Sequence, residues 1–270
     1  MTAVGAWLVA HEGVVRLTAF LTTLALMLAW QTLRPLRGDG RPARRQAINA
    51  ALVLIDTLML RLLFPVLAVG LALELQARDI GLFNHLDGPP ALTIPLAVLV
   101  LDMAIYWQHR LMHRLPLLWR LHRVHHSDTG FDVSTGVRFH PIEIALSMVI
   151  KLALVWLLGP DPAAVVIFEL ALSLGSLCTH TDAALPSALD RRLRWLLVTP
   201  SMHRIHHSLL RQETDSNYGF HLSIWDRLFG SYRARPLGQE ANMAIGLEQF
   251  RRPDQQSLSA LLRQPFDADR

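Results

Sequence analysis

Long apolar stretches separated by short polar loops make up much of the chain. Crossing a bilayer takes about 20 mostly apolar residues, and five stretches approach or exceed that length: 14–30, 48–75, 92–107, 142–158 and 163–177. The last two are joined by Gly159, Pro160, Asp161 and Pro162, a combination typical of a tight turn. The pattern predicts an all-α, integral-membrane helical bundle of about four to five hydrophobic segments. It leaves open whether the 142–177 hairpin fully spans the bilayer.

The composition agrees with a membrane protein. Of the 270 residues, 51% are hydrophobic and 18% charged, and the mean hydropathy is +0.29. Soluble domains carry about 25% charged residues. The net charge of +4 comes from scattered arginines, and no basic run is interleaved with aromatic residues, so we expect a bilayer and no nucleic acid as partner.

The arginines also predict an orientation. Five lie in the loop 34–45, whereas the loop 77–91 carries one. Loops rich in positive charge stay in the cytoplasm. The chain would therefore return to the cytoplasmic side near Gln108, and the segments that follow the spans would lie on that side.

Eight of the 13 histidines fall into three short windows on this side: His109 and His113; His122, His125 and His126; and His203, His206 and His207. Spacings of three and four return side chains to one face of a helix. Imidazole is a good ligand for iron, zinc, copper and nickel. Eight converging imidazoles are too many for one ion and suit two, so we predict a cytosolic, histidine-rich helical cap that binds metal.

Neighbouring residues refine this picture. Pro116 should end one helix and allow another to begin, and Ser201 is expected to cap the helix of the third window. His180, just beyond the hairpin, is a further candidate ligand. Asp102 and His140 either support ligands by hydrogen bonds or serve ordinary structural roles.

The number of histidines bears on the metal. Catalytic zinc needs only three protein ligands, and the chain has no H-E-x-x-H motif. Iron accepts five or six ligands, so two irons fit the set best. An iron pair beside apolar spans predicts dioxygen-dependent attack on a lipid C–H bond, with the protein supplying ligands and a dry site.

The segments that carry this chemistry are DMAIYWQHRLMHR (102–114), LWRLHRVHHS (118–127), RFHPIE (138–143), TPSMHRIHHS (199–208), DSNYG (215–219) and WDRLFG (225–230). Over about 100–231 the chain resembles the fatty acid hydroxylase/sterol desaturase superfamily of membrane di-iron oxidoreductases. The resemblance implies two Fe ions, dioxygen as co-substrate, and ligand roles for the eight clustered histidines and His180. It also implies that Asn217 and Asp226 orient imidazoles, although a turn and a helix start explain them nearly as well. Ser176 stands where some relatives have a further histidine.

We therefore expect N-terminal transmembrane helices over 1–91, a catalytic domain over 92–233 and a polar tail over 234–270. The expected reaction is hydroxylation or desaturation of a sterol or fatty-acyl lipid, and the sequence separates neither the two outcomes nor the lipids. The alternatives are a carotenoid or isoprenoid hydroxylase and a membrane metal-binding or transport protein, whose ligands should lie near the bilayer midplane.

A separate electron donor (ferredoxin, cytochrome or reductase) would be needed. Four arginines near the clusters would steer such a donor or contact lipid headgroups: Arg110, Arg123, Arg204 and Arg211.

Overall fold

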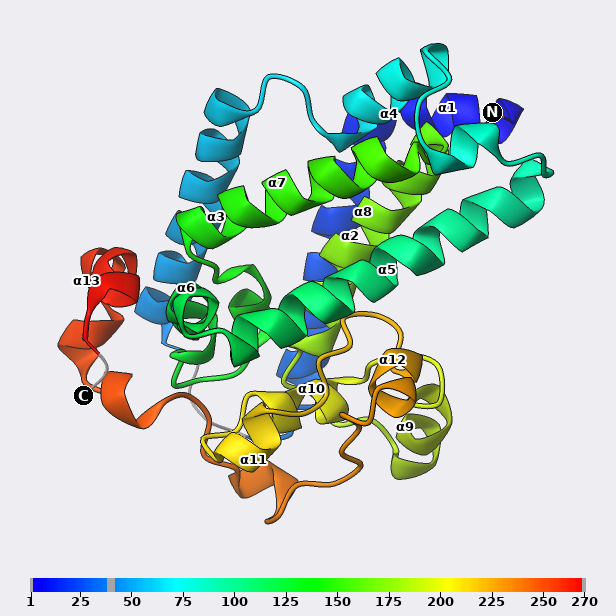
Figure 1. The fold of residues 1–270 in the computed structure, drawn as a ribbon. Coiled ribbons are helices and arrows are strands. Elements are labelled where there is room, and N and C mark those ends of the chain that lie inside the picture. Colours follow the sequence, from blue (N-terminus) through cyan, green and yellow to red (C-terminus); the bar gives the residue numbers. More distant parts are fainter. Residues whose placement is uncertain (1, 38–41, 269–270) are drawn as a thin grey trace.

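The computed structural model describes residues 2–37 and 42–268, and within them it contains helices, turns and three isolated bridges but no strand (Figure 1). The α-helices are α1 (Ala3–Ala10), α2 (Glu12–Leu33), α3 (Ala43–Leu63), α4 (Ala68–Ala77), α5 (Pro90–Arg114), α6 (Pro116–His126), α7 (Pro141–Leu158), α8 (Pro162–Thr179), α9 (Ser187–Leu193), α10 (Pro200–His206), α11 (Arg211–Thr214), α12 (Ile224–Leu228) and α13 (Leu258–Arg263). Short 3-10 helices are η1 (Leu82–His85), η2 (Val133–Val137), η3 (Glu240–Asn242), η4 (Glu248–Phe250), η5 (Pro253–Gln256) and η6 (Gln264–Phe266). The predicted all-α class is confirmed.

Five segments in the described part of the chain are long and apolar enough to cross a membrane: α2, Ala43–His85, α5, α7 and α8. Large apolar side chains such as Leu17, Leu62 and Trp156 are exposed on their outer faces, where acyl chains rather than water would cover them. The protein is an integral membrane protein. The stretch expected over 48–75 is two helices, α3 and α4, because Pro65 lies between them and cannot continue a helix.

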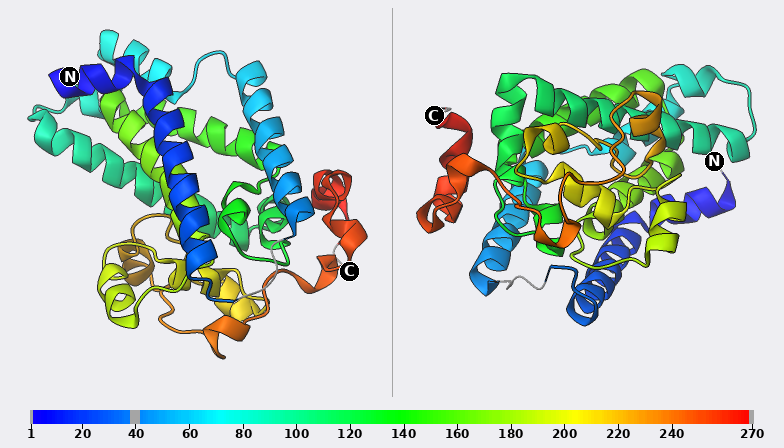
Figure 2. Two further views of the ribbon diagram at one scale, coloured as in Figure 1. Left: turned by 180° about the vertical axis from the view of Figure 1, so that it is seen from behind. Right: turned by 90° about the horizontal axis from the view of Figure 1, so that it is seen from below.

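The short helices that follow the hairpin gather at one end of the spans. In Figure 1, α5, α7 and α8 run across the upper part, and α9 to α12 gather below them. Seen from behind in Figure 2, α2 and α3 both descend to this lower end, so the described part of the arginine-rich loop lies beside the cap. Pro35 forms a bridge with Ala183 there. Arg41 of that loop lies outside the described residues.

The C-terminal segment packs back onto the bundle. Leu261 of α13 is buried against Leu52 of α3 and Val124 of α6. The red segment in Figure 1 accordingly lies beside α3 and α6. The end of the chain therefore supports the helix that carries the second histidine window.

The predicted hairpin of α7 and α8 is confirmed. Gly159 ends α7 in the left-handed conformation, with φ 57°, and the Asp161 side chain accepts a hydrogen bond from the Ala163 N–H (2.8 Å) at the start of α8. A Cβ atom on Gly159 would lie 2.3 Å from the backbone oxygen of Ile80. The turn therefore requires glycine for its backbone angle and for the close approach of the segment after α4.

Gly159→Ala should lower the free energy of unfolding by more than about 1 kcal/mol, since the left-handed conformation alone costs an alanine that much and the clash with Ile80 adds to it. Gly13→Ala in α2 is the control, because a Cβ there meets nothing within 4 Å. Thermal unfolding in detergent measures both. Equal melting temperatures for the two variants would contradict this account of the turn.

Candidate metal centre

Four helices deliver nine buried histidines to one region at the lower end of the spans. The last turns of α5 carry His109 and His113. Pro116 begins α6 as predicted, and that helix carries His122, His125 and His126; His180 directly follows α8, and α10 with the residue after it provides His203, His206 and His207. One expectation was wrong. The cap of α10 is Thr199, whose hydroxyl accepts from the Met202 N–H (3.3 Å), because Pro200 occupies the first helical position and leaves Ser201 inside the helix.

The nine imidazoles form two groups, in each of which one nitrogen per ring lies within 4.8 Å of the others. One group contains His109, His113, His122, His126 and His206; the other contains His125, His180, His203 and His207. Each H-x-x-H-H motif is split between the groups. Adjacent rings on a helix point in different directions, so His125 and His126 serve different centres.

The second group shows most clearly what such a site requires. The Nδ1 of His180 lies 2.7 Å from the Ser176 carbonyl oxygen, and the Nδ1 of His125 lies 3.1 Å from the Arg138 carbonyl oxygen. A carbonyl only accepts hydrogen bonds, so both Nδ1 atoms carry the proton and donate it. The two Nε2 atoms face each other at 3.2 Å.

Protonation does not explain this approach. Burial lowers the pKa of His180 to about 4 and that of His125 well below its usual value, so both rings are neutral near pH 7. Two neutral rings with protonated Nδ1 atoms present only lone pairs to each other. His203 and His207 also place Nε2 atoms 3.0 and 3.2 Å from that of His180. Such a set of donors fits a cation between the rings.

The first group repeats this arrangement. The Nδ1 atoms of His109 and His206 donate to the carbonyl oxygens of Tyr218 (2.8 Å) and Ser216 (2.7 Å), and their Nε2 atoms lie 3.0 Å apart. Burial lowers the pKa of His206 to about 3. The Nε2 atoms of His113, His122 and His126 are buried without a hydrogen-bond partner among the described residues. The residues present therefore fit a second metal ion as well.

Glu143 is a candidate site residue that the sequence reasoning missed. One of its carboxylate oxygens accepts from Nδ1 of His122 at 2.7 Å, and both side chains are buried. Carboxylates commonly hold metal-binding histidines in this way, fixing the tautomer and raising the basicity of the other nitrogen. The signal was its position in the first turn of α7, which begins at Pro141 directly after His140.

Asn217 and Asp226 bond to backbone groups near the imidazoles and not to the rings themselves. Asn217 has φ 53°, and its side chain bonds to the Met202 carbonyl (3.0 Å) and to the Arg233 N–H (2.8 Å). Asp226 accepts from the backbone N–H groups of Tyr218 (2.7 Å) and Gly219 (2.8 Å). Together they hold residues 216–219 in place, and the carbonyls of Tyr218 and Ser216 in this segment accept hydrogen bonds from His109 and His206.

The other predicted supporting residues have different partners. Asp102 accepts from Nδ1 of His221 (2.5 Å) and from the Trp225 indole N–H (2.7 Å). His140 takes the helix-start role: its Nδ1 accepts from the Ile142 N–H (3.1 Å) and its Nε2 lies 3.1 Å from the Leu262 carbonyl oxygen. Ser176 supplies the carbonyl for His180, while its hydroxyl donates to the Gly136 carbonyl (2.6 Å).

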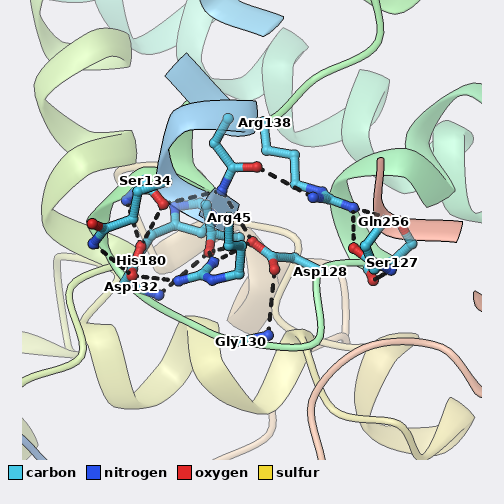
Figure 3. A network of polar contacts seen from close by, with 12 residues as sticks. Arg45, Ser127, Asp128, Gly130, Asp132, Ser134, Arg138, His180 and Gln256 are labelled. Carbon is cyan, nitrogen blue, oxygen red and sulfur yellow. Dashed lines mark hydrogen bonds and ion pairs between the residues drawn. The ribbon is translucent and has the colours of Figure 1, made fainter. Parts of the chain in front are cut away.

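A buried polar network supports the second group (Figure 3). Arg45, at the start of α3, lies between the carboxylates of Asp128 and Asp132. Asn49 connects Asp128 to Arg138, with bonds of 3.3 and 3.2 Å. Arg138, whose own carbonyl holds His125, also donates to the Val124 carbonyl at the end of α6 (2.9 Å). The membrane span α3 is thus tied to the loop that orients a histidine.

A cavity of about 340 Å³ lies between the spans and reaches the histidines. His109 and His122 line it, and most of the remaining lining is apolar, including Phe20, Leu60, Ile105, Met148, Leu172 and Phe220. An elongated apolar molecule in this cavity would contact the first histidine group.

The arginines near the clusters separate into two kinds. Arg123 is buried and donates to the carbonyl oxygens of Gln264 and Asp267. Arg204 is buried beside Glu240 and Asp182. Both side chains are held inside the protein and contact neither a docking protein nor lipid headgroups, whereas Arg211 is exposed and Arg110 is half-buried. A role of these arginines in steering a donor stays a prediction.

Comparisons with known proteins agree with this site. The chain is 37% identical over 151 residues to alkylglycerol monooxygenase of Danio rerio, covering 56% of this chain and 32% of that protein. It is 32% identical over 158 residues to ornithine lipid hydroxylase OlsE of Rhizobium tropici (58% and 46%), and 28% identical over 142 residues to Delta(7)-sterol 5(6)-desaturase erg3B of Aspergillus fumigatus (53% and 39%). The match thus spans less than half the length of each of these relatives. No solved structure matches the chain.

The family comparison covers all nine histidines. Residues 94–231, just over half of the chain, match the family described as fatty acid hydroxylase. This region begins in α5 and ends just beyond α12, so it contains both histidine groups and the segment that Asp226 holds. The resemblance noted in the sequence is confirmed: the chain belongs to the fatty acid hydroxylase family.

Proposed function

We propose that the protein is a dioxygen-dependent lipid hydroxylase or desaturase whose two histidine groups each bind one iron ion. The observation that carries the proposal is the pair of histidine groups beside an apolar cavity: in one the Nε2 atoms of His180 and His125 face each other, and in the other those of His206 and His109 do. Family membership supports the same reading. The relatives named alkylglycerol monooxygenase, ornithine lipid hydroxylase and sterol desaturase support a lipid substrate.

The protein's own residues would bind the iron ions, orient the histidine ligands and keep water away from the site. The carbonyls of Ser176, Arg138, Ser216 and Tyr218 keep their histidines in the tautomer that leaves Nε2 free to bind metal. The apolar cavity walls would hold the lipid chain beside His109 and His122 and exclude water. When bound, iron would supply the activation of dioxygen and the attack on a C–H bond.

The overall reaction sets what else is needed. Hydroxylation places one oxygen atom in the lipid and the other in water, and it consumes two electrons and two protons; desaturation removes two hydrogens and releases two waters with the same supply. A separate electron donor would deliver these electrons. We place the histidine groups on the cytoplasmic side, because the described part of the arginine-rich loop lies at the same end.

The position of the histidines favours an enzyme over a metal transporter. Transport sites lie near the middle of the membrane. Here His109 and His113 occupy the last turns of α5, and His180 lies one residue beyond α8. Both placements are at the ends of spans, where a soluble electron donor can approach.

Purified protein made with ample iron should contain about two irons per chain, one for each histidine group. His206→Ala and His125→Ala each remove a ligand from one group, so each should lower the iron content and abolish lipid oxidation. His85→Ala is the control, since His85 is exposed and belongs to neither group.

Metal analysis and untargeted lipid profiles of cells with and without each variant give the readouts. A single zinc per chain, with no iron taken up on reconstitution, would sink the di-iron assignment. Wild-type lipid products from the His206→Ala or His125→Ala protein would remove that histidine from the ligand set.

Glu143→Leu should weaken iron binding about 10- to 100-fold, the usual effect of losing a carboxylate that orients a ligand. Glu143→Gln keeps an oxygen that can accept from His122, so it should retain most of the affinity. Iron release into a chelator, followed over a titration, measures both. If the leucine variant held iron as firmly as the wild type, Glu143 would have no role in positioning His122.

A further inference from the structure

The apolar cavity beside the histidines contains polar oxygens without partners. Asp56 of α3 is 5% exposed and Glu143 of α7 is 3% exposed, and both line the cavity, as does Gln108 of α5. Asp56 Oδ1, Glu143 Oε2 and Gln108 Oε1 are buried without a hydrogen-bond partner among the described residues. A buried carboxylate or amide oxygen left in this way is costly.

Apart from Nε2 of His122, which belongs to the first histidine group, several other polar groups of the cavity are paired. Glu169 accepts from Arg16 (2.7 Å) and from Lys151 (2.6 Å). The Gln108 amide N–H donates to the Ser147 hydroxyl at 2.8 Å. The unpaired atoms are therefore all acceptors, and they come from three different spans.

These acceptors lie at the histidine end of the cavity. Gln108 precedes His109 in α5, and the other oxygen of Glu143 already accepts from His122. Asp56 and Glu143 interact electrostatically, so the two side chains lie near each other, and unpaired buried oxygens in one cavity favour a ligand that donates hydrogen bonds. The rest of the lining suits an acyl or alkyl chain.

We infer that the substrate is an amphipathic lipid whose hydroxyl or amine group enters the cavity and donates hydrogen bonds to Asp56 and Gln108. The apolar chain fills the remaining space, and the polar group lies at the end near the histidines. The oxidised carbon is then close to the polar group. This inference rests on the proposed function for the oxidation itself, but its binding claim stands independently.

Three probes with the same alkyl chain differ in whether their polar group can donate a hydrogen bond: 1-hexadecanol and hexadecylamine can, and hexadecyl methyl ether cannot. The full chain in detergent is titrated with each, and the rise in melting temperature gives an apparent affinity. The alcohol and the amine should bind about tenfold more tightly than the ether, which corresponds to about 1.4 kcal/mol and is close to the net contribution of one hydrogen bond.

Substitutions of Asp56 and Gln108 test whether these residues cause the preference for hydrogen-bond donors. Asp56→Leu should reduce the difference between alcohol and ether to less than about threefold, whereas Asp56→Asn keeps an acceptor oxygen and should retain most of the preference for donors. Gln108→Leu repeats the test at a second acceptor if Asp56→Leu does not fold. Thr32→Val is the control, because Thr32 lies outside the cavity and its hydroxyl donates to the Leu28 carbonyl.

Equal binding of all three probes, or an unchanged preference in Asp56→Leu and Gln108→Leu, would overturn the inference. So would stabilisation by sodium or calcium ions that matches the alcohol and removes its advantage over the ether. None of these readouts needs electron supply or turnover. Donor preference without lipid oxidation would therefore remove the proposed function alone, and oxidation without donor preference would remove this inference alone.

Discussion

The close approach of nine buried imidazoles in two groups is the constraint on which the rest of this structure depends. A lone pair 3.2 Å from another lone pair, as between His180 and His125, is unfavourable unless positive charge lies between them. Protonating the rings would supply charge, but burial lowers the pKa of His180 to about 4 and so disfavours that solution near neutral pH. A metal ion satisfies both requirements, because it binds the neutral form.

The surrounding structure mainly holds the Nδ1 side of these rings, which is opposite the Nε2 atom that faces the other histidines. The acceptors are backbone carbonyls at helix ends and in loops, such as Ser176 in the last turn of α8 and Ser216 in an irregular segment. Loops alone would be too mobile to hold a ring, so they are tied down by buried ionic and polar contacts. Asp226 holds the segment after α11, and Arg45 holds the segment after α6 against a membrane span (Figure 3). The histidine cap and the bundle therefore form one connected structure.

The sequence predicted the parts of the site that follow from local geometry. Spans, hairpin and the break at Pro116 depend on apolar length and on proline and glycine, whose effects are local. His109 and His113 share a face because they are four apart, and they do belong to one group. The split of His125 from His126, and the pairing of His125 with His180, depend on how α6, α8 and α10 pack, which no local pattern encodes. The role of Glu143 was hidden for the same reason: its partner is 21 residues away.

The most direct test of the account is anomalous diffraction at the iron edge from crystals of the iron-loaded protein. The account predicts two anomalous peaks, one enclosed by His109, His113, His122, His126 and His206 and the other by His125, His180, His203 and His207. It also predicts that the carbonyls of Ser176 and Tyr218 remain on the far side of their rings. A single peak, or iron bound outside both groups, would contradict the central claim.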